Sequence, residues 1–421
     1  MSEVGGRLRR LRAERGLTQR ELAEPHYTAA YVSSVETGSR TPSGDALRHF
    51  ADRLGVEADE LLGAASPREV VQLDLDIATA AEEFLSGDGS ATKMRRLARQ
   101  AERLGKPRQA GLAWLWLARR ATGDTRPRLV TAAESALADD IPPFRELVVP
   151  LRAAVLIGWG ESQHALHLLR SSLDECDFPH PVLLLTLHAS LADAHLRLGE
   201  VAAAAQHAAE ALRLARGGEE VLAELTRHQM TLASACLEDG RIPDAMVAVA
   251  AVHDLLHERA LRPELARCLY ARALLRRSSD PEGALRDLAA SRETFPDDMV
   301  TLELAELSCE LGRLDDAAAL LGEAASAIPP DSGLAAALLY QRGSLAMAHG
   351  DAEAAETLLT GAIDVAARHG ARGVLAGSVD RAGDLLHAQG RVADAADLLR
   401  RGLLLLGAEE DFSPGTCGGR R

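Results

Sequence analysis

A glycine followed five positions later by an alanine recurs between residues 160 and 395, and no other feature constrains the fold of this chain as strongly. Successive glycines are separated by 39, 41, 72, 38 and 40 residues, so the long gap has room for one degenerate unit. That unit runs from Pro263 to Pro296, with Ala284 in the alanine position. Such a repeat predicts a helix, a glycine turn and a second helix per unit, stacked as a solenoid. The pairs are Gly160/Ala165, Gly199/Ala204, Gly240/Ala245, Gly312/Ala317, Gly350/Ala355 and Gly390/Ala395.

Small residues at fixed places within each unit allow its two helices to cross closely. This pattern resembles the tetratricopeptide repeat (TPR). The period near 40 residues exceeds the roughly 34 residues of that family, so we expect longer helices, and a HEAT-like solenoid is the alternative fold. The matching small residues are Ala192, Ala204, Ala208 and Ala211 in one unit, and Ala305, Ala317 and Ala324 in another, which has Pro329 after its second helix.

Composition and charge favour an all-α protein with one region suited to nucleic acid. Aromatic residues make up only 3% of the chain, which suits helices packed through small side chains and suits β-sandwiches poorly. The formal net charge is −15, yet residues 1–53 hold nine arginines against seven acids, which leaves −17 for the remainder. We therefore expect any phosphate-facing surface near the N-terminus, and the acidic remainder to face away from DNA.

The cysteine spacing and the hydropathy of the chain indicate the cellular compartment of the protein. The five cysteines are widely spaced and form no C-x-x-C pair, which is typical of reduced residues. No apolar run approaches the roughly 18 residues of a membrane span, and the first residues hold no apolar signal segment. We expect a cytoplasmic protein without a membrane partner.

Residues 1–62 predict five short helices. Gly16 ends the first helix, and Thr18 and Glu21 form a capping box that starts the second, because each satisfies a free backbone N–H of the other. Pro25 cannot continue the second helix. The remaining helices are expected over residues 29–36, 43–54 and 57–62, with Thr28 and Ser43 as caps and Gly38 and Gly55 as stops.

The pattern of these helices resembles the XRE (lambda-repressor and Cro) helix-turn-helix (HTH) family. It combines a capping box, two turn glycines and a periodic core over about fifty positions, whereas any one of these features alone would be weak evidence for the family. The matching residues are Leu11, Gly16, Leu17, Thr18, Gln19, Glu21, Leu22, Ala23, Val32, Ser33, Glu36, Gly38, Pro42, Leu47, Phe50, Ala51, Leu54, Gly55 and Val56.

The resemblance implies that residues 28–36 form the recognition helix in the major groove of double-stranded DNA. The implied base-edge readers are Ala29, Ala30, Ser33 and Ser34, the implied phosphate contacts are Gln19 and Arg40, and Thr28 and Tyr31 complete the expected surface. The turn at residues 24–27 is one residue shorter than that of the family and lacks its glycine, so the angle between the two helices is expected to differ. The face also lacks the side chains that bind bases bidentately, so we expect methyl and hydroxyl contacts together with shape readout.

The first helix of each repeat is expected to line a concave surface that binds peptides or partner helices. The alternative is that these positions are ordinary solvated helix residues. The positions carried over from the TPR family are Asp193, Arg197, Arg227, Met230, Glu306, Tyr340, Asp380 and Asp384.

The combined prediction is an all-α chain: an HTH domain over residues 1–63, a linker with one helix over 64–91, a TPR-like domain over 92–407 and a disordered tail over 408–421. This organisation resembles the RRNPP peptide-pheromone receptors, which implies a peptide in the groove and a homodimer. The chain has no asparagine, the residue that typically holds the peptide backbone in that family, so a partner protein competes with a peptide as ligand.

We therefore expect a homodimeric transcription regulator that binds a pseudo-palindromic operator. The alternative is an interaction scaffold whose HTH domain no longer binds DNA. No nucleotide-binding or catalytic motif is present, so neither an enzyme nor a cofactor is expected. His253 and His257 have the spacing of a metal pair, but no cysteine or carboxylate pattern completes a site, and no metal is expected.

Overall fold

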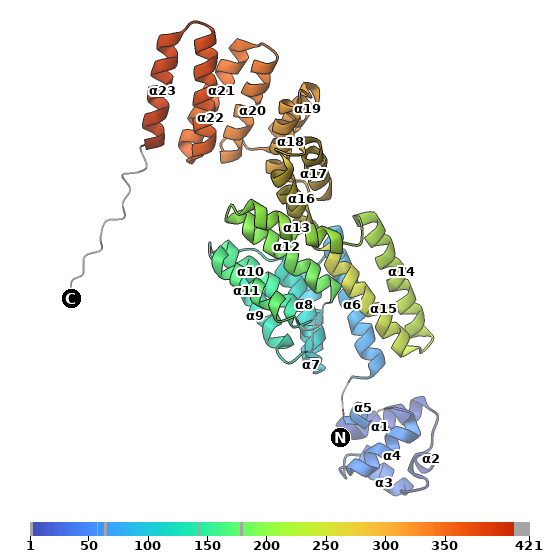
Figure 1. Cartoon of the computed structure of the whole chain (residues 1–421). Coiled ribbons are helices and arrows are strands. Elements are labelled where there is room, and N and C mark those ends of the chain that lie inside the picture. Colours follow the sequence, from blue (N-terminus) through green and yellow to red (C-terminus); the bar gives the residue numbers. More distant parts are fainter. Residues whose placement is uncertain (1–2, 57, 63–64, 141–143, 177–179, 408–421) are drawn as a thin grey trace, which may run out of the picture. The chain divides into compact units, whose positions relative to one another are not determined.

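The computed structural model describes residues 3–56, 58–62, 65–140, 144–176 and 180–407, and over these residues its regular structure is helical throughout (Figure 1). The all-α prediction is therefore confirmed. The expected disordered tail at 408–421 lies outside the described residues, as does position 57 at the start of the fifth expected helix. No helix in the described part of the chain is both long and apolar enough to cross a lipid bilayer.

The N-terminal bundle forms as its caps predict. Thr28 and Ser43 each accept a hydrogen bond from the backbone three residues on, and Gly55 adopts the left-handed conformation that ends a helix. The apolar faces of the helices meet in one core, of which Leu22, Val32 and Phe50 are fully buried. The helices are α1 (Glu3–Glu14), α2 (Gln19–Ala23), α3 (Ala29–Glu36), α4 (Gly44–Leu54) and α5 (Ala58–Leu62).

Longer helices follow, mostly paired through tight turns. They are α6 (Pro67–Ser86), α7 (Ala91–Arg103), α8 (Pro107–Arg120), α9 (Thr125–Leu137), the short 3-10 helix η1 (Glu146–Val148), α10 (Val149–Gly158), α11 (Ser162–Asp174), α12 (Pro181–Arg197), α13 (Val201–Leu214), α14 (Glu219–Glu238), α15 (Ile242–Arg259), α16 (Arg262–Arg276), α17 (Pro281–Thr294), α18 (Asp298–Glu310), α19 (Leu314–Ala327), α20 (Gly333–Ala348), α21 (Ala352–His369), α22 (Arg372–Ala388) and α23 (Val392–Gly407).

The glycine and alanine repeat is confirmed at every predicted position. All six glycines have φ between 73° and 83°, a region that residues with a Cβ rarely occupy, and all six alanines are buried. The degenerate unit is also present, because its predicted segment folds into the helix pair α16 and α17 and Ala284 is fully buried. Gly105 and Ala110 supply a further pair with the same spacing, which the sequence analysis did not identify.

The chain divides into two compact units, residues 1–194 with 214–261, and residues 195–213 with 262–421. In the first unit, α6 packs Val71 and Leu75 against α14 and α15, and Leu73 and Ile77 against α7 and α8. The helix expected in a linker therefore belongs to a packed body of helices. In the second unit, α16 to α22 share one continuous apolar core.

Candidate DNA-binding site

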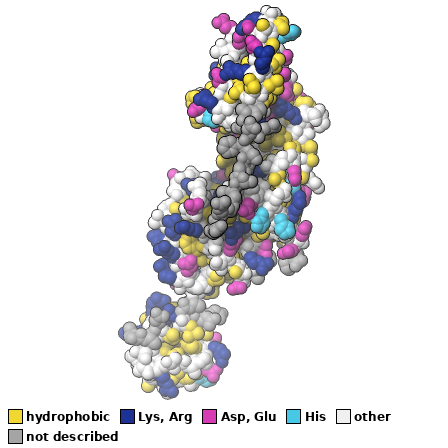
Figure 2. Space-filling view, turned by 90° about the vertical axis from the view of Figure 1, so that its left-hand side faces the viewer, with side chains coloured by type: hydrophobic (Ala, Val, Ile, Leu, Met, Phe, Trp, Pro, Cys, Tyr) yellow, Lys and Arg dark blue, Asp and Glu magenta, His cyan; other side chains and the backbone are white. Residues whose placement is uncertain are grey.

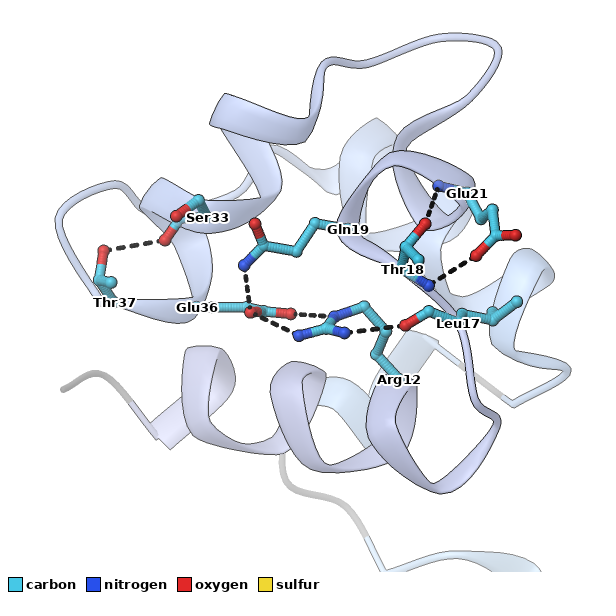
Figure 3. Close-up of polar contacts among 8 residues, drawn as sticks. All are labelled: Arg12, Leu17, Thr18, Gln19, Glu21, Ser33, Glu36 and Thr37. Atoms are coloured by element: carbon cyan, nitrogen blue, oxygen red, sulfur yellow. Dashed lines mark hydrogen bonds and ion pairs between the residues drawn. The ribbon is translucent and has the colours of Figure 1, made fainter.

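The start of α2 is held by the predicted capping box (Figure 3). The backbone N–H of Thr18 donates to Oε2 of Glu21 at 2.7 Å, and the backbone N–H of Glu21 donates to Oγ1 of Thr18 at 3.2 Å. Two N–H groups that a helix of five residues leaves without helical partners are satisfied in this way.

A buried carboxylate, Glu36, joins three helices of this bundle (Figure 3). Arg12 of α1 donates from Nε to Oε1 of Glu36 at 2.6 Å and from Nη2 to Oε2 at 3.1 Å, while Nε2 of Gln19 in α2 donates to the same Oε2 at 2.8 Å. Nη1 of Arg12 also donates to the carbonyl oxygen of Leu17 at 2.8 Å. This bidentate pair fixes the end of α3 relative to α1 and α2.

Two residues of the predicted DNA-binding region take part in this network. Arg12, one of the nine arginines of residues 1–53, has a side chain that is only 16% exposed and is paired with Glu36. Gln19, an expected phosphate contact, is half-buried and donates from Nε2 to Glu36. The matched family residues include Glu36, but spacing alone did not indicate that it accepts hydrogen bonds from two other helices.

The pKa of Glu36 lies below its ordinary value of 4.5. Burial by itself raises this pKa, but the hydrogen bonds from Arg12 and Gln19 and the charge of Arg12 outweigh it. The carboxylate therefore stays ionised at neutral pH, and its pairing stabilises the folded bundle there.

The outer face of α3 carries the short side chains that the sequence predicts. Thr28 and Ala30 are exposed, and Ala29, Ser33 and Ser34 are half-buried. The hydroxyl of Ser34 donates to the carbonyl oxygen of Tyr31 at 2.7 Å, so it remains free only to accept from a base. Thr37 caps the end of α3, because its Oγ1 donates to the carbonyl oxygen of Ser33 at 2.9 Å (Figure 3).

Arg40 follows α3 and stands over an aromatic ring. Its guanidinium carbon lies 4.8 Å from the centre of the Tyr31 ring, and its backbone N–H donates to the carbonyl oxygen of Ser34 at 3.1 Å. Tyr31 is half-buried and stacks on Tyr27, with ring centres 5.2 Å apart. Tyr31 therefore positions Arg40, whose exposed guanidinium retains its donors for an anion.

The expected ligand groove is only partly assembled in the second unit. Adjoining cavities of about 350 and 690 Å³ lie between α18, α20 and α22, and Glu306, Tyr340 and Gln341 line both. Gln341 is 9% exposed, and its Oε1 has no hydrogen-bond partner in the part of the chain that the structure describes. Glu306 and Tyr340 are thus brought together, with Gln341 as a lining residue that the sequence did not single out.

Arg277 of α16 makes ion pairs with Glu303 at 3.0 Å, Glu306 at 3.5 Å and Glu310 at 2.7 Å, so the acidic side of the cavities is partly neutralised.

The remaining predicted groove residues do not line these cavities. Met230 packs against the core of the first unit. The other five are Asp193 and Arg197 on α12, exposed Arg227 on α14, and exposed Asp380 and Asp384 on α22, and none of them lines these two cavities.

The histidine pair considered for a metal is buried within α15. Nδ1 of His257 lies 2.8 Å from the carbonyl oxygen of His253, and burial lowers the pKa of both rings, that of His257 to about 3. Among the described residues, no three His, Cys, Asp or Glu side chains are grouped to hold a metal ion.

A small bundle that presents the face of its third helix, followed by stacked helix pairs, defines a helix-turn-helix protein with a helical-repeat domain. The Helix-turn-helix domain family matches residues 3–62. The uncharacterized HTH-type transcriptional regulator y4dJ of Sinorhizobium fredii (strain NBRC 101917 / NGR234) is 43% identical over 60 residues, which cover 14% of this chain and 78% of that protein. The chain therefore belongs to the HTH-type transcriptional regulators.

Solved structures show more distant similarity. Bacillus thuringiensis PlcR in complex with the peptide PapR7 and DNA is 15% identical, with 63% of this chain and 99% of that chain covered and a TM-score of 0.34. The apo form of RapI is 10% identical, with 80% and 97% covered and a TM-score of 0.45. Apo ComR from Streptococcus vestibularis is 11% identical, with 74% and 97% covered and a TM-score of 0.30.

The Glu36 network predicts an acid sensitivity of α3. Because the pKa of Glu36 is lowered in the folded state, its contribution is complete above about pH 4.5 and is lost as pH falls through the lowered value. Glu36→Gln is expected to cost about 3 kcal/mol at neutral pH, since it leaves Arg12 without its counter-charge, and to abolish this pH dependence. Hydrogen exchange of the α3 amides in the full chain, corrected for the intrinsic rate at each pH, measures both effects.

The matched control is Glu24→Gln, which removes an exposed partner of Arg20 in the same domain. This variant should keep the wild-type protection of α3 and its pH dependence. Equal behaviour of the two variants would contradict the role given to Glu36.

Proposed function

We propose that the protein binds DNA sequence-specifically through α3 and regulates transcription, as a homodimer controlled by a peptide or partner protein in the repeat groove. The observation that carries the DNA-binding part is the outer face of α3, which is exposed at Ala30, held at its end by the Glu36 network and flanked by Arg40. Short side chains let the helix backbone approach base edges closely. Ala29 and Ala30 would contact thymine methyl groups, and Ser33 and Ser34 would contact base edges by hydrogen bonds.

Phosphate contacts in this proposal come from Arg40 and from the amino end of α3. In the first turn of α3, the backbone N–H groups of Ala29 and Ala30 have no partner among the described residues, and Thr28, which caps the N–H of Tyr31, is exposed beside them at the positive end of the helix dipole. Gln19 stays part of the proposed surface: one N–H of its Nε2 is donated to Glu36, and the second N–H of the same amide would donate to a phosphate oxygen. Arg40 is therefore the main fixed cation of the site.

The α3 surface is tested by two substitutions. Arg40→Ala should weaken binding about threefold to tenfold on every duplex and flatten the salt dependence by about one unit, because one phosphate contact is lost. Ala30→Glu should weaken binding more than about tenfold, because it places a carboxylate against the DNA. Filter binding or gel shift on duplexes selected from a random pool by the wild-type protein measures both.

Controls carry the same chemical changes away from α3. Arg48→Ala removes an exposed arginine of α4, and Ala202→Glu adds a carboxylate at an exposed position of α13. Both should bind DNA as the wild type does. Failure of the wild-type protein to select any duplex at low salt would instead favour the interaction scaffold.

Dimerisation is proposed from the size of the readout surface. One α3 with few base-specific donors is expected to bind near the nonspecific range of about 10⁻⁴ to 10⁻⁶ M, and about 10⁻⁸ M generally requires two half-sites. We expect the repeat domain to form the dimer contact, because the N-terminal domain is small. We expect a pseudo-palindrome with half-site centres about one helical turn apart and two copies per selected duplex in sedimentation velocity. A single unrepeated footprint protected by a monomer would contradict this.

The cavities between α18, α20 and α22 are the proposed ligand site. They combine the Tyr340 ring, unsatisfied Gln341 and the partly neutralised carboxylate of Glu306, groups that a peptide backbone or side chain can satisfy. A random heptapeptide pool incubated with the protein should yield retained peptides, and retention should fall at least about fivefold in Gln341→Ala. Arg342→Ala, a change at the next position, is the control. Equal retention by both variants would place the ligand elsewhere.

A further inference from the structure

The segment 93–108 is strongly basic within an acidic chain. It holds seven lysines and arginines against one acid, Glu102, and includes both lysines of the protein, although the chain as a whole has a net charge of −15. Figure 2 shows basic and acidic side chains interspersed over one face of the helical-repeat part, the usual arrangement of a solvated surface. The segment departs from that arrangement.

Most of this charge lies on α7, which is sharply two-sided. Met94, Leu97, Ala98 and Ala101 are buried in the core that α7 shares with α6 and α8. The opposite face exposes Arg95, Arg96, Arg99 and Arg103. Arg95, Arg99 and Arg103 follow one another at intervals of four residues, so they form a stripe about 12 Å long on one side of the helix.

These four arginines have no ion-pair or hydrogen-bond partner among the described residues. The nearby carboxylate Glu102 instead accepts a hydrogen bond from Nε1 of Trp114 at 3.0 Å, and Lys93 is paired with Glu83 at 2.5 Å. Exposed arginines elsewhere are commonly paired within the chain, as in Arg213 with Glu210, Arg241 with Asp244, Arg313 with Glu282 and Arg400 with Asp397.

Like charges one turn apart repel one another, so this stripe destabilises α7 slightly in the free protein. A bound polyanion removes that repulsion, and its binding becomes tighter as it contacts more of these charges. Arginine suits phosphate in particular, because its planar guanidinium donates two parallel hydrogen bonds to phosphate oxygens.

We propose that the exposed arginine face of α7 binds phosphates of the same DNA duplex that α3 reads, outside the bases that α3 contacts. This inference rests on the proposed function. Only residues 63–66 separate α5 from α6, so Leu62 and Pro67 are at most about 18 Å apart, and α6 is about 30 Å long. These connections keep α7 within about 50 Å of α5, a distance that exceeds the half-length of a 20-base-pair duplex, about 34 Å, and that the flanks of a 60-base-pair duplex cover.

The proposal changes the expectation drawn from net charge. The net negative charge of the repeat domain predicts that this domain faces away from DNA. The stripe of unpaired arginines on α7 instead gives the domain one face that attracts the duplex. Affinity gained there is independent of base sequence, so it strengthens binding without altering which sequence is preferred.

The test compares two duplexes that share one core selected by the wild-type protein. One is about 20 base pairs and the other carries flanks to about 60 base pairs, and affinity is measured from about 50 to about 200 mM salt. The variant replaces Arg95, Arg96, Arg99 and Arg103 by alanine. Its affinity for the long duplex should fall at least about tenfold, and its salt slope on that duplex should fall by about two to four units, with a smaller loss on the short duplex.

Two further variants separate charge from structure. Replacing the same four arginines by lysine keeps the charge and should retain most of the binding, because the phosphate term is largely electrostatic. Replacing Arg213, Arg241, Arg313 and Arg400 by alanine changes the net charge equally and should leave both affinities at the wild-type level. Circular dichroism of each variant checks that its helical content equals that of the wild type.

The outcomes distinguish this inference from the function on which it rests. Wild-type affinity and salt slope in the α7 alanine variant would overturn the inference and leave DNA binding by α3 standing. Equal losses in the two alanine variants would also overturn it, since a general charge effect would then explain the result. A wild-type protein that binds no duplex, while its α7 arginines bind vesicles rich in phosphatidylglycerol, would overturn both.

Discussion

The solenoid depends on how closely two helices can cross within each repeat. At six of the seven predicted units a glycine with positive φ ends the first helix, and five residues later an alanine is buried where the second helix meets it. A larger side chain at the alanine would force the helices apart, and a side chain at the glycine would strain the turn. This constraint accounts for a core rich in alanine and leucine with few aromatic residues, and it leaves the outward faces free to vary.

The N-terminal bundle is organised by charge as well as by apolar packing. Its core is apolar, but α3 is oriented by a carboxylate that two other helices contact. Such a pair fixes the orientation of its two side chains, because the guanidinium donates two parallel hydrogen bonds that lie in the plane of the carboxylate. The orientation of the proposed recognition helix therefore depends on Arg12, a residue that contacts no DNA in this account.

Charge has a different role in each part of the molecule. Buried or half-buried arginines such as Arg12 and Arg277 neutralise carboxylates within the fold. Arg40 is held by an aromatic ring, and the exposed arginines of α7 make no ion pair within the part of the chain that the structure describes. The net charge of −15 sums over all these roles, so it indicates little about where an anion binds.

The sequence by itself determined the local structure: the helix caps at Thr18, Thr28 and Ser43, the glycine stops, the period of the repeats and the all-α class. These follow from backbone geometry and hydrophobic periodicity, which act over a few residues and are visible in a single chain. Only the tertiary structure decided which polar groups pair. Gln19 meets Glu36, α6 joins the packed helices, and Tyr340 lies beside Gln341, because contacts between residues far apart in the chain depend on how whole helices pack.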